Sequence, residues 1–304
     1  MARLISTLLR AQIALVNPLL RRLDIGALRK LQDALGTLGT KTLAGEVAYR
    51  DVDGFPFQAA WAEPPAPASD GAILYLHGGS YTAGTLAYAK SFGGVLAEKT
   101  GHRVLCLGYR LAPEHPYPAA LEDALAAYEY LLSLCPTEKI TLVGESAGGG
   151  LCYCLCLELK ALGLSQPARI VALSPWTDLT MSALPDEETA RDPILSTDRL
   201  AHSAHMYAGA NLAEPTVSPL FGDLTGLPPS LIIAGTDEIL LPDSTRMADR
   251  LRAHGCACEL RVEPDMWHVY PLYPIPEAKE ALERIRACIA DEGEVNHGVP
   301  EDRP

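Results

Sequence analysis

One serine of this chain stands where its hydroxyl can act as a nucleophile. Ser146 lies in the stretch Gly144-Glu145-Ser146-Ala147-Gly148, after the apolar run 140–143 and before the apolar stretch 147–162. The run predicts a buried strand and the stretch predicts a helix. Flanking glycines permit a sharp strand-to-helix turn that lifts the serine hydroxyl above the sheet edge, and the helix N-terminus favours developing negative charge there. We therefore expect Ser146 to attack a carbonyl carbon.

A serine hydroxyl needs a neighbouring base, and two histidines are candidates. Both His254 and His268 follow the strand predicted at 231–234 and precede the polar end of the chain. His254 ends a predicted helix before Gly255, where an imidazole suits the C-terminal end of the helix dipole. His268 follows the strand predicted at 259–262 and a loop, from which a side chain can reach back to the serine. His268 is the predicted base; the alternative is a loop histidine packed against Trp267.

The acid that orients the base is expected after the strand 231–234, because such triads run serine, acid, histidine along the chain. Asp237 follows this strand and is the predicted acid. It would hold the imidazole tautomer and stabilise the imidazolium without taking the proton. Glu238 and Asp243 compete for this role, but both are expected to cap or charge the start of the helix at 242.

An oxyanion formed on the substrate would need backbone donors beside the serine. Gly78 and Gly79 follow His77 and the strand predicted at 72–76, and their bare N–H groups can converge there with that of Ala147. Each such donor contributes about 3 kcal/mol in the transition state. We interpret His77 as a structural brace of this loop.

The elements that must position these residues alternate along the chain. Further strands are predicted at 46–52 and 57–61, flanking the hairpin signal Asp53-Gly54, and at 104–107 and 170–173. Helices are predicted at 86–99, 119–134, 242–253 and 277–289. Alternation of helices with continuously apolar strands indicates an α/β fold with a mostly parallel central sheet flanked by helices.

Three segments fall outside this alternation. Residues 1–45 have helical spacing, and 177–217 is too long for a simple crossover between two strands. We expect both to form a helical cap over the strand ends of a core made of 46–176 and 218–290. Residues 291–304 are polar, contain two prolines and are expected to form a disordered tail.

Composition excludes several functions. The 304 residues carry a formal net charge of −13, which would repel nucleic acid. No run approaches the roughly 20 apolar residues of a membrane span, so stable membrane insertion is not expected. The first 20 residues read as an amphipathic helix packed on the body, with a membrane-surface role as the alternative.

The spacing of the eight cysteines fits neither a zinc site nor a disulfide scaffold, which favours reduced thiols and a cytoplasmic location.

Several ordered blocks together carry a family resemblance. The chain resembles the hormone-sensitive-lipase group of α/β-hydrolases, the bacterial-type carboxylesterases related to arylacetamide deacetylase. The resemblance covers roughly 71–273 and rests on these blocks: His77-Gly78-Gly79, 109–118 (YRLAPEHPYP), 144–149 (GESAGG), 174–179 (SPWTDL), 218–220 (SPL) and His268.

The resemblance implies a triad of Ser146, Asp237 and His268 and an oxyanion hole from Gly78, Gly79 and Ala147. It further implies the α/β-hydrolase fold, the helical cap, and a homodimer through the sheet edge. Two departures stand out. Ser80 replaces a third glycine, and Glu145 stands where aspartate or threonine is common, so its longer carboxylate is expected to alter hydrogen bonds around the nucleophile.

We expect a carboxylesterase that hydrolyses short-to-medium acyl esters through an acyl-enzyme, with no metal or cofactor. The aromatic and apolar residues expected near the cleft are Tyr81, Trp176, Met206 and Tyr207. Lactones, such as monoterpene lactones, and amides or acetyl groups are alternative substrates for the same machinery, and an interfacial lipase is a further alternative. A non-catalytic ligand receptor is a distant alternative, since plant gibberellin receptors of this fold have lost the histidine that His268 provides here.

Overall fold

The sheet is built as the alternation of apolar runs predicts. A computed structural model describes residues 2–20, 23–42, 45–184 and 191–290. The described part contains one eight-stranded sheet of order β1-β2-β4-β3-β5-β6-β7-β8. Its strands are β1 (Ala48–Val52), β2 (Gln58–Glu63), β3 (Ala72–Leu76), β4 (Arg103–Gly108), β5 (Ile140–Glu145), β6 (Arg169–Leu173), β7 (Ser230–Gly235) and β8 (Cys258–Glu263). β2 pairs antiparallel with β1 and β4, and the other neighbours are parallel, which confirms the mostly parallel α/β sheet.

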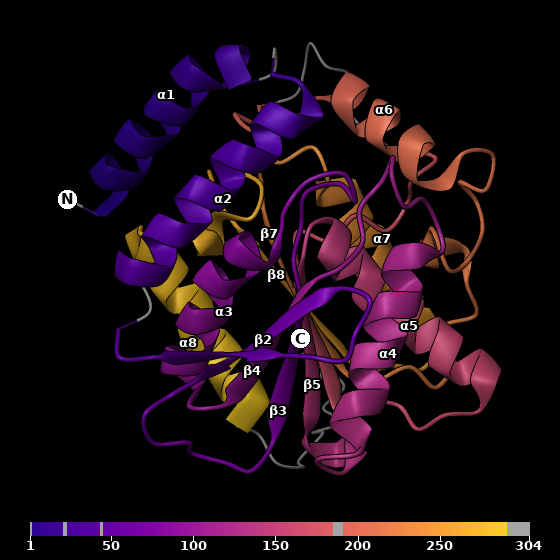
Figure 1. The fold of residues 1–304 in the computed structure, drawn as a ribbon. Helices are drawn as coiled ribbons and strands as arrows, with labels where there is room; N and C mark the ends of the chain where they lie inside the picture. Colours follow the sequence, from indigo (N-terminus) through magenta and orange to yellow (C-terminus); the bar gives the residue numbers. More distant parts are fainter. Residues whose placement is uncertain (1, 21–22, 43–44, 185–190, 291–304) are drawn as a thin grey trace, which may run out of the picture.

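Helices cover both faces of this sheet (Figure 1). One face packs against α3 (Leu86–Thr100) and α8 (Pro276–Ala290), whose side chains share an apolar cluster with strand residues. The other face packs against α4 (Ala119–Leu132), α5 (Ala147–Leu162) and α7 (Leu241–Ala253). Central strands such as β3 and β5 are buried along their whole length, which is why β3 reads as an unbroken apolar run and β5 as a mostly apolar one.

Further helices lie over the loops at the carboxyl ends of the strands. These are α1 (Ala2–Leu20), α2 (Ile25–Thr42) and α6 (Thr197–Ala208) (Figure 1). Arg29 of α2 donates to the carbonyl oxygens of Thr82 and Ala112, in the loops after β3 and β4. Asn17 of α1 donates to the carbonyl oxygen of Pro193 at 2.6 Å, so the N-terminal helices and the 177–217 insertion touch. We propose that they form the cap together. The expected tail, 291–304, lies outside the described residues.

The outward face of α1 is apolar. Leu4, Leu15 and Leu19 are 60%, 78% and 64% exposed, whereas Ser6 and Asn17 on the opposite face are buried. Among the described residues, no helix combines the length and the apolarity that crossing a bilayer requires. The membrane-surface role of α1 stays an alternative, and the cytoplasmic location and the homodimer through the sheet edge stay predictions.

The cysteines are all free thiols in this fold. Six are buried, and Cys258 and Cys288 are partly exposed. Cys152, Cys154 and Cys156 all lie in α5, the helix predicted for that stretch. Burial raises the pKa of the Cys106 thiol to about 12, so this group remains protonated and packs as a small apolar side chain.

Candidate active site

Ser146 occupies a strained turn between β5 and α5. Its φ of 54° and ψ of −122° lie outside the regions that L-residues normally adopt. The flanking glycines are needed because the chain passes other backbone closely there. A Cβ on Gly144 would stand 2.3 Å from the carbonyl oxygen of Gly148, and one on Gly148 would stand 2.0 Å from that of Leu76. The G-x-S-x-G pattern thus fixes a serine at the carboxyl edge of the sheet.

A chain of hydrogen bonds links this serine to a buried carboxylate. Oγ of Ser146 lies 2.9 Å from Nε2 of His268, and Nδ1 of His268 lies 2.9 Å from Oε2 of Glu238. The carboxylate can only accept, so Nδ1 carries the proton and Nε2 is free to accept the serine proton. All three residues are buried, with 5% or less of their surface exposed. The arrangement has the geometry of a nucleophile, a base and an orienting acid.

The acid beside the imidazole is Glu238, so the prediction of Asp237 was wrong. Asp237 directs its carboxylate away from His268, and its Oδ2 accepts a hydrogen bond from Arg10 at 2.5 Å. Glu238 points inward, where its Oε1 also accepts the N–H of Gly235 at 2.7 Å. Glu238 therefore does not cap α7, contrary to expectation, and its longer side chain spans the gap to the imidazole.

Asp243, the other competitor, lies apart from the imidazole. Its Oδ2 accepts the backbone N–H groups of Thr177 and Asp178 at 2.7 and 2.8 Å, which ties the first turn of α7 to the segment after β6. Burial raises the pKa of Asp243 to about 7. This carboxyl group braces the start of the 177–217 insertion.

The loop after β3 lies against the serine, but its first glycine is not a free donor. The N–H of Gly78 donates to Oε1 of Glu145 at 2.6 Å, so the prediction that Gly78 supplies an oxyanion donor was wrong. Within the described residues, the N–H groups of Gly79, Ser80 and Ala147 donate no hydrogen bond. Gly79 has a φ of 116°, and a Cβ there would stand 2.2 Å from the carbonyl oxygen of Ala83. This position therefore requires glycine.

Glu145 anchors this loop from a fully buried position. Besides the N–H of Gly78, its carboxylate accepts the hydroxyl of Tyr75 at 2.6 Å and that of Tyr88 at 3.2 Å. Burial raises the pKa of Glu145 to about 7, although these hydrogen bonds oppose the shift. The longer side chain at this position thus joins the nucleophile turn to the loop after β3.

His77 braces the same loop. Its ring stacks on Tyr109 with centroids 4.2 Å apart, and its Nδ1 lies 2.7 Å from the carbonyl oxygen of Gly78. Burial lowers the pKa of His77 to about 4, so the ring is neutral at pH 7. A neutral, stacked imidazole agrees with the structural role expected from the sequence.

An aromatic cluster lies next to the nucleophile turn. Tyr81 stacks on Tyr207 with centroids 3.8 Å apart, and Trp176 packs against Tyr81. The backbone N–H of Trp176 donates to the carbonyl oxygen of Ser146 at 2.9 Å, which fixes the cluster close to the serine. Met206 is partly buried against the same core. The structure thus brings three of the four predicted pocket residues into one aromatic cluster beside Ser146.

Sequence reasoning missed Arg10 and Asp192. Arg10 binds Asp237 from a helix more than 200 residues away in the chain, and Asp192 accepts the N–H of Ile239 at 3.2 Å. The one available signal was Arg10 itself, a charge that interrupts the run of apolar residues in α1. No local pattern indicated its partner.

Comparisons with known proteins show what the whole chain is similar to. The family model described as alpha/beta hydrolase fold matches residues 73–272. An acetyl-hydrolase of Streptomyces hygroscopicus is 38% identical over 260 residues, which cover 84% of each chain. A crystal structure of a hormone-sensitive lipase from a metagenome library superposes with a TM-score of 0.86 at 33% identity, covering 93% of this chain and 97% of that one. The esterase EstE5, in a crystal soaked with p-nitrophenyl butyrate, superposes with a TM-score of 0.83 at 33% identity, covering 92% and 98%.

Proposed function

The chain belongs to the α/β-hydrolase family, in its hormone-sensitive-lipase group of ester hydrolases, and we propose that Ser146, His268 and Glu238 form its catalytic triad. The unbroken hydrogen-bond chain from Ser146 Oγ through His268 to Glu238 carries this proposal. No other buried histidine of the described residues lies within hydrogen-bond distance of both a serine hydroxyl and a carboxylate.

The proposed reaction is acyl transfer in two steps. Nε2 of His268 takes the proton of Ser146 as its Oγ attacks the ester carbonyl carbon, and the imidazolium is stabilised by Glu238. The imidazolium then protonates the leaving alcohol, which departs and leaves an acyl-serine. A water molecule, deprotonated by the same imidazole, attacks the acyl carbon; the acid leaves and Ser146 recovers its proton. These residues can carry out both steps of the proposed reaction without a metal or a cofactor.

The oxyanion would be held by the backbone donors that remain free. Gly78 is committed to Glu145, which leaves Gly79, Ser80 and Ala147 as the proposed donors. Ser80 has a φ of 54° and lies in the loop after β3. Ser80 replaces glycine without affecting such a hole, because the donor is its backbone N–H. Each donor would contribute about 3 kcal/mol to transition-state stabilisation.

The proposed substrates are esters of short to medium acyl chains. The similar protein of Streptomyces hygroscopicus is named an acetyl-hydrolase, and EstE5 crystals were soaked with a butyrate ester. Tyr81, Trp176, Met206 and Tyr207 are the proposed walls of the substrate pocket. In this proposal the ring of Tyr207, which stacks on Tyr81, would limit the acyl length.

The test compares two serine variants in hydrolysis of p-nitrophenyl acetate and butyrate. Ser146→Ala removes the nucleophile, and kcat should fall by about 10⁵-fold or more. Ser244→Ala is the matched control, because Ser244 is equally buried but lies in α7 outside the hydrogen-bond chain. The control should keep its kcat. Substantial turnover by Ser146→Ala would overturn the proposal.

A further inference from the structure

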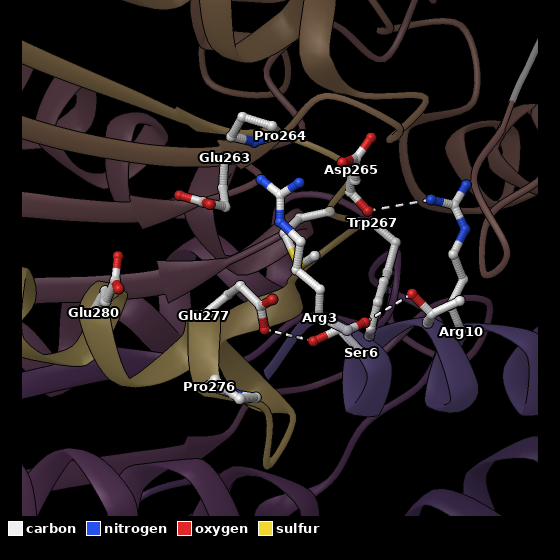
Figure 2. Close-up of a pocket in the computed structure, with 12 residues that line it drawn as sticks. Arg3, Ser6, Arg10, Glu263, Pro264, Asp265, Trp267, Pro276, Glu277 and Glu280 are labelled. Atoms are coloured by element: carbon white, nitrogen blue, oxygen red, sulfur yellow. Dashed lines mark hydrogen bonds between the residues drawn. The ribbon is translucent and has the colours of Figure 1, made fainter. Parts of the chain in front are cut away.

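A cavity of about 480 Å³ borders the loop that leads to His268. Its walls come from α1, from residues 263–267 and from the start of α8 (Figure 2). Arg3 and Arg10 of α1 both line it, and Glu263, Glu277 and Glu280 lie on the opposite wall. Of these two arginines, Arg10 is the one whose hydrogen bonds to the active-site loops are seen among the described residues.

The guanidinium of Arg10 joins three segments that are distant in sequence. Nη1 donates to Oδ2 of Asp237 at 2.5 Å and to the carbonyl oxygen of Asp265 at 3.1 Å, and Nη2 donates to the carbonyl oxygen of Arg191 at 2.8 Å. Figure 2 shows the contact with Asp265. Asp237 precedes the triad acid, Asp265 belongs to the loop before His268, and Arg191 belongs to the 177–217 insertion. One side chain of α1 therefore holds the acid turn, the histidine loop and the insertion together.

The acid turn is held on both sides of Glu238. Arg10 binds the side chain of Asp237, and Oδ2 of Asp192 accepts the N–H of Ile239 at 3.2 Å. The turn is also bonded directly to the histidine loop, because the N–H of Asp237 donates to the carbonyl oxygen of Met266 at 2.9 Å. A displacement of Asp237 would therefore move Glu238 and His268 relative to Ser146.

We infer that Arg10 is a positioning residue for the proposed triad, through which the N-terminal helix holds Glu238 and His268 in register with Ser146. The inference rests on the proposed function and adds a residue that touches neither substrate nor reacting atoms. The side chain of Arg10 is 26% exposed and that of Asp237 is 11% exposed, so this ion pair is partly shielded from water. A hydrogen bond between two charged groups is stronger than one between neutral groups. Arg10 thus acts on the chemical step rather than on substrate binding.

The test uses Arg10→Met, with Arg3→Met as the matched control on the same helix and in the same cavity. Misplacement of the triad by about 1 Å costs up to about 100-fold, so Arg10→Met should lower kcat for p-nitrophenyl butyrate by about 10- to 100-fold. KM should stay nearly unchanged, and the rate of inactivation by a fluorophosphonate should fall in parallel with kcat. Arg10→Lys, which keeps the charge but not the fork, should recover part of the loss. Arg3→Met should behave as the wild type.

A second arm approaches the same contact from the acid turn. Asp237→Ala should lower kcat to a similar degree with α1 intact, and the double variant Arg10→Met/Asp237→Ala should be no slower than Arg10→Met alone. The inference is overturned if Arg10→Met and Arg3→Met have equal kcat, if only KM rises, or if the two losses multiply. Should Arg10→Met fail to fold, an unchanged kcat in Asp237→Ala overturns it. These outcomes are independent of Ser146→Ala, which tests the triad itself.

Discussion

Nδ1 of His268 lies 2.9 Å from Oε2 of Glu238, with both side chains withdrawn from solvent. A charge-assisted hydrogen bond of this kind is strong where water does not compete for either partner. It fixes the imidazole so that Nε2 faces Ser146, 2.9 Å from its Oγ. The neighbouring carboxylate of Asp237 serves a separate contact with Arg10.

The first prediction separates these two adjacent acids. Glu238→Gln keeps the size of the side chain, but the neutral amide cannot stabilise the imidazolium. Its oxygen would accept the N–H of Gly235, so its NH2 group would face Nδ1 of His268 and favour the wrong tautomer. We expect kcat for p-nitrophenyl butyrate to fall by about 10⁴-fold. Asp237→Ala, which removes the contact with Arg10, should lower kcat by only about 10- to 100-fold. Steady-state kinetics of both variants give the comparison.

The reverse order of these losses would contradict the assignment. If Asp237→Ala lost far more activity than Glu238→Gln, Asp237 would have to be the acid in solution. Equal thermal unfolding temperatures for the two variants would ensure that the difference arises in the active site.

The fold follows from the sequence because burial leaves clear patterns. Strands such as β3 and β5 are covered on both faces, and their mostly apolar sequences indicate the order of the elements. The glycines around Ser146 marked a close approach of backbone, which is a local requirement. The place of Ser146 in a strand-to-helix turn could therefore be predicted.

The remaining parts of the site depend on which way neighbouring side chains point. Asp237 and Glu238 are adjacent acids in one turn, and only the packing of α1 and of the histidine loop directs the first outward and the second inward. Gly78 has the residue type of an oxyanion donor, but the carboxylate of Glu145 occupies its N–H. Such contacts join segments far apart in the sequence and leave no periodic pattern.

The second prediction concerns Glu145 and the pH dependence of stability. Its folded pKa of about 7 exceeds the ordinary value of 4.5, so the folded state binds this proton more tightly than the unfolded state. The resulting stability is fully present below pH 4.5 and is lost as the pH rises through 7. Relative to Glu145→Gln, the wild type should lose about 3 kcal/mol of unfolding free energy between pH 4.5 and 8.

Urea unfolding at several pH values measures this difference. Glu129→Gln is the control, because Glu129 is exposed on α4 and its replacement should leave the pH dependence of the wild type intact. Parallel curves for wild type and Glu145→Gln would show that the buried carboxyl group does not carry the effect.

The third prediction concerns the backbone donors of the proposed oxyanion hole. Gly79→Ala would place a Cβ 2.2 Å from the carbonyl oxygen of Ala83, so the loop must move. Displacement of a donor should lower kcat by about 10²- to 10³-fold. Gly226→Ala is the control, since Gly226 also has a positive φ, of 80°, but open space around it. An unchanged kcat in Gly79→Ala would argue against a hole built on this loop.

The fourth prediction concerns acyl length. Tyr207→Ala removes the ring that stacks on Tyr81 and should extend the accepted acyl chain. The ratio of kcat/KM for p-nitrophenyl octanoate to that for the acetate should rise by about tenfold, as expected for about 1.4 kcal/mol of new apolar contact. Tyr207→Phe keeps the ring and should keep the wild-type ratio. The same ratio in all three proteins would place the acyl pocket elsewhere.

The central claim is that Ser146 is the activated nucleophile of a Ser146, His268, Glu238 triad. Mass spectrometry of the protein after reaction with a fluorophosphonate tests it most directly. The account predicts one covalent adduct, located on Ser146, that is absent in Ser146→Ala and forms far more slowly in Glu238→Gln. An adduct on another residue, or undiminished labelling of Ser146→Ala, would contradict it.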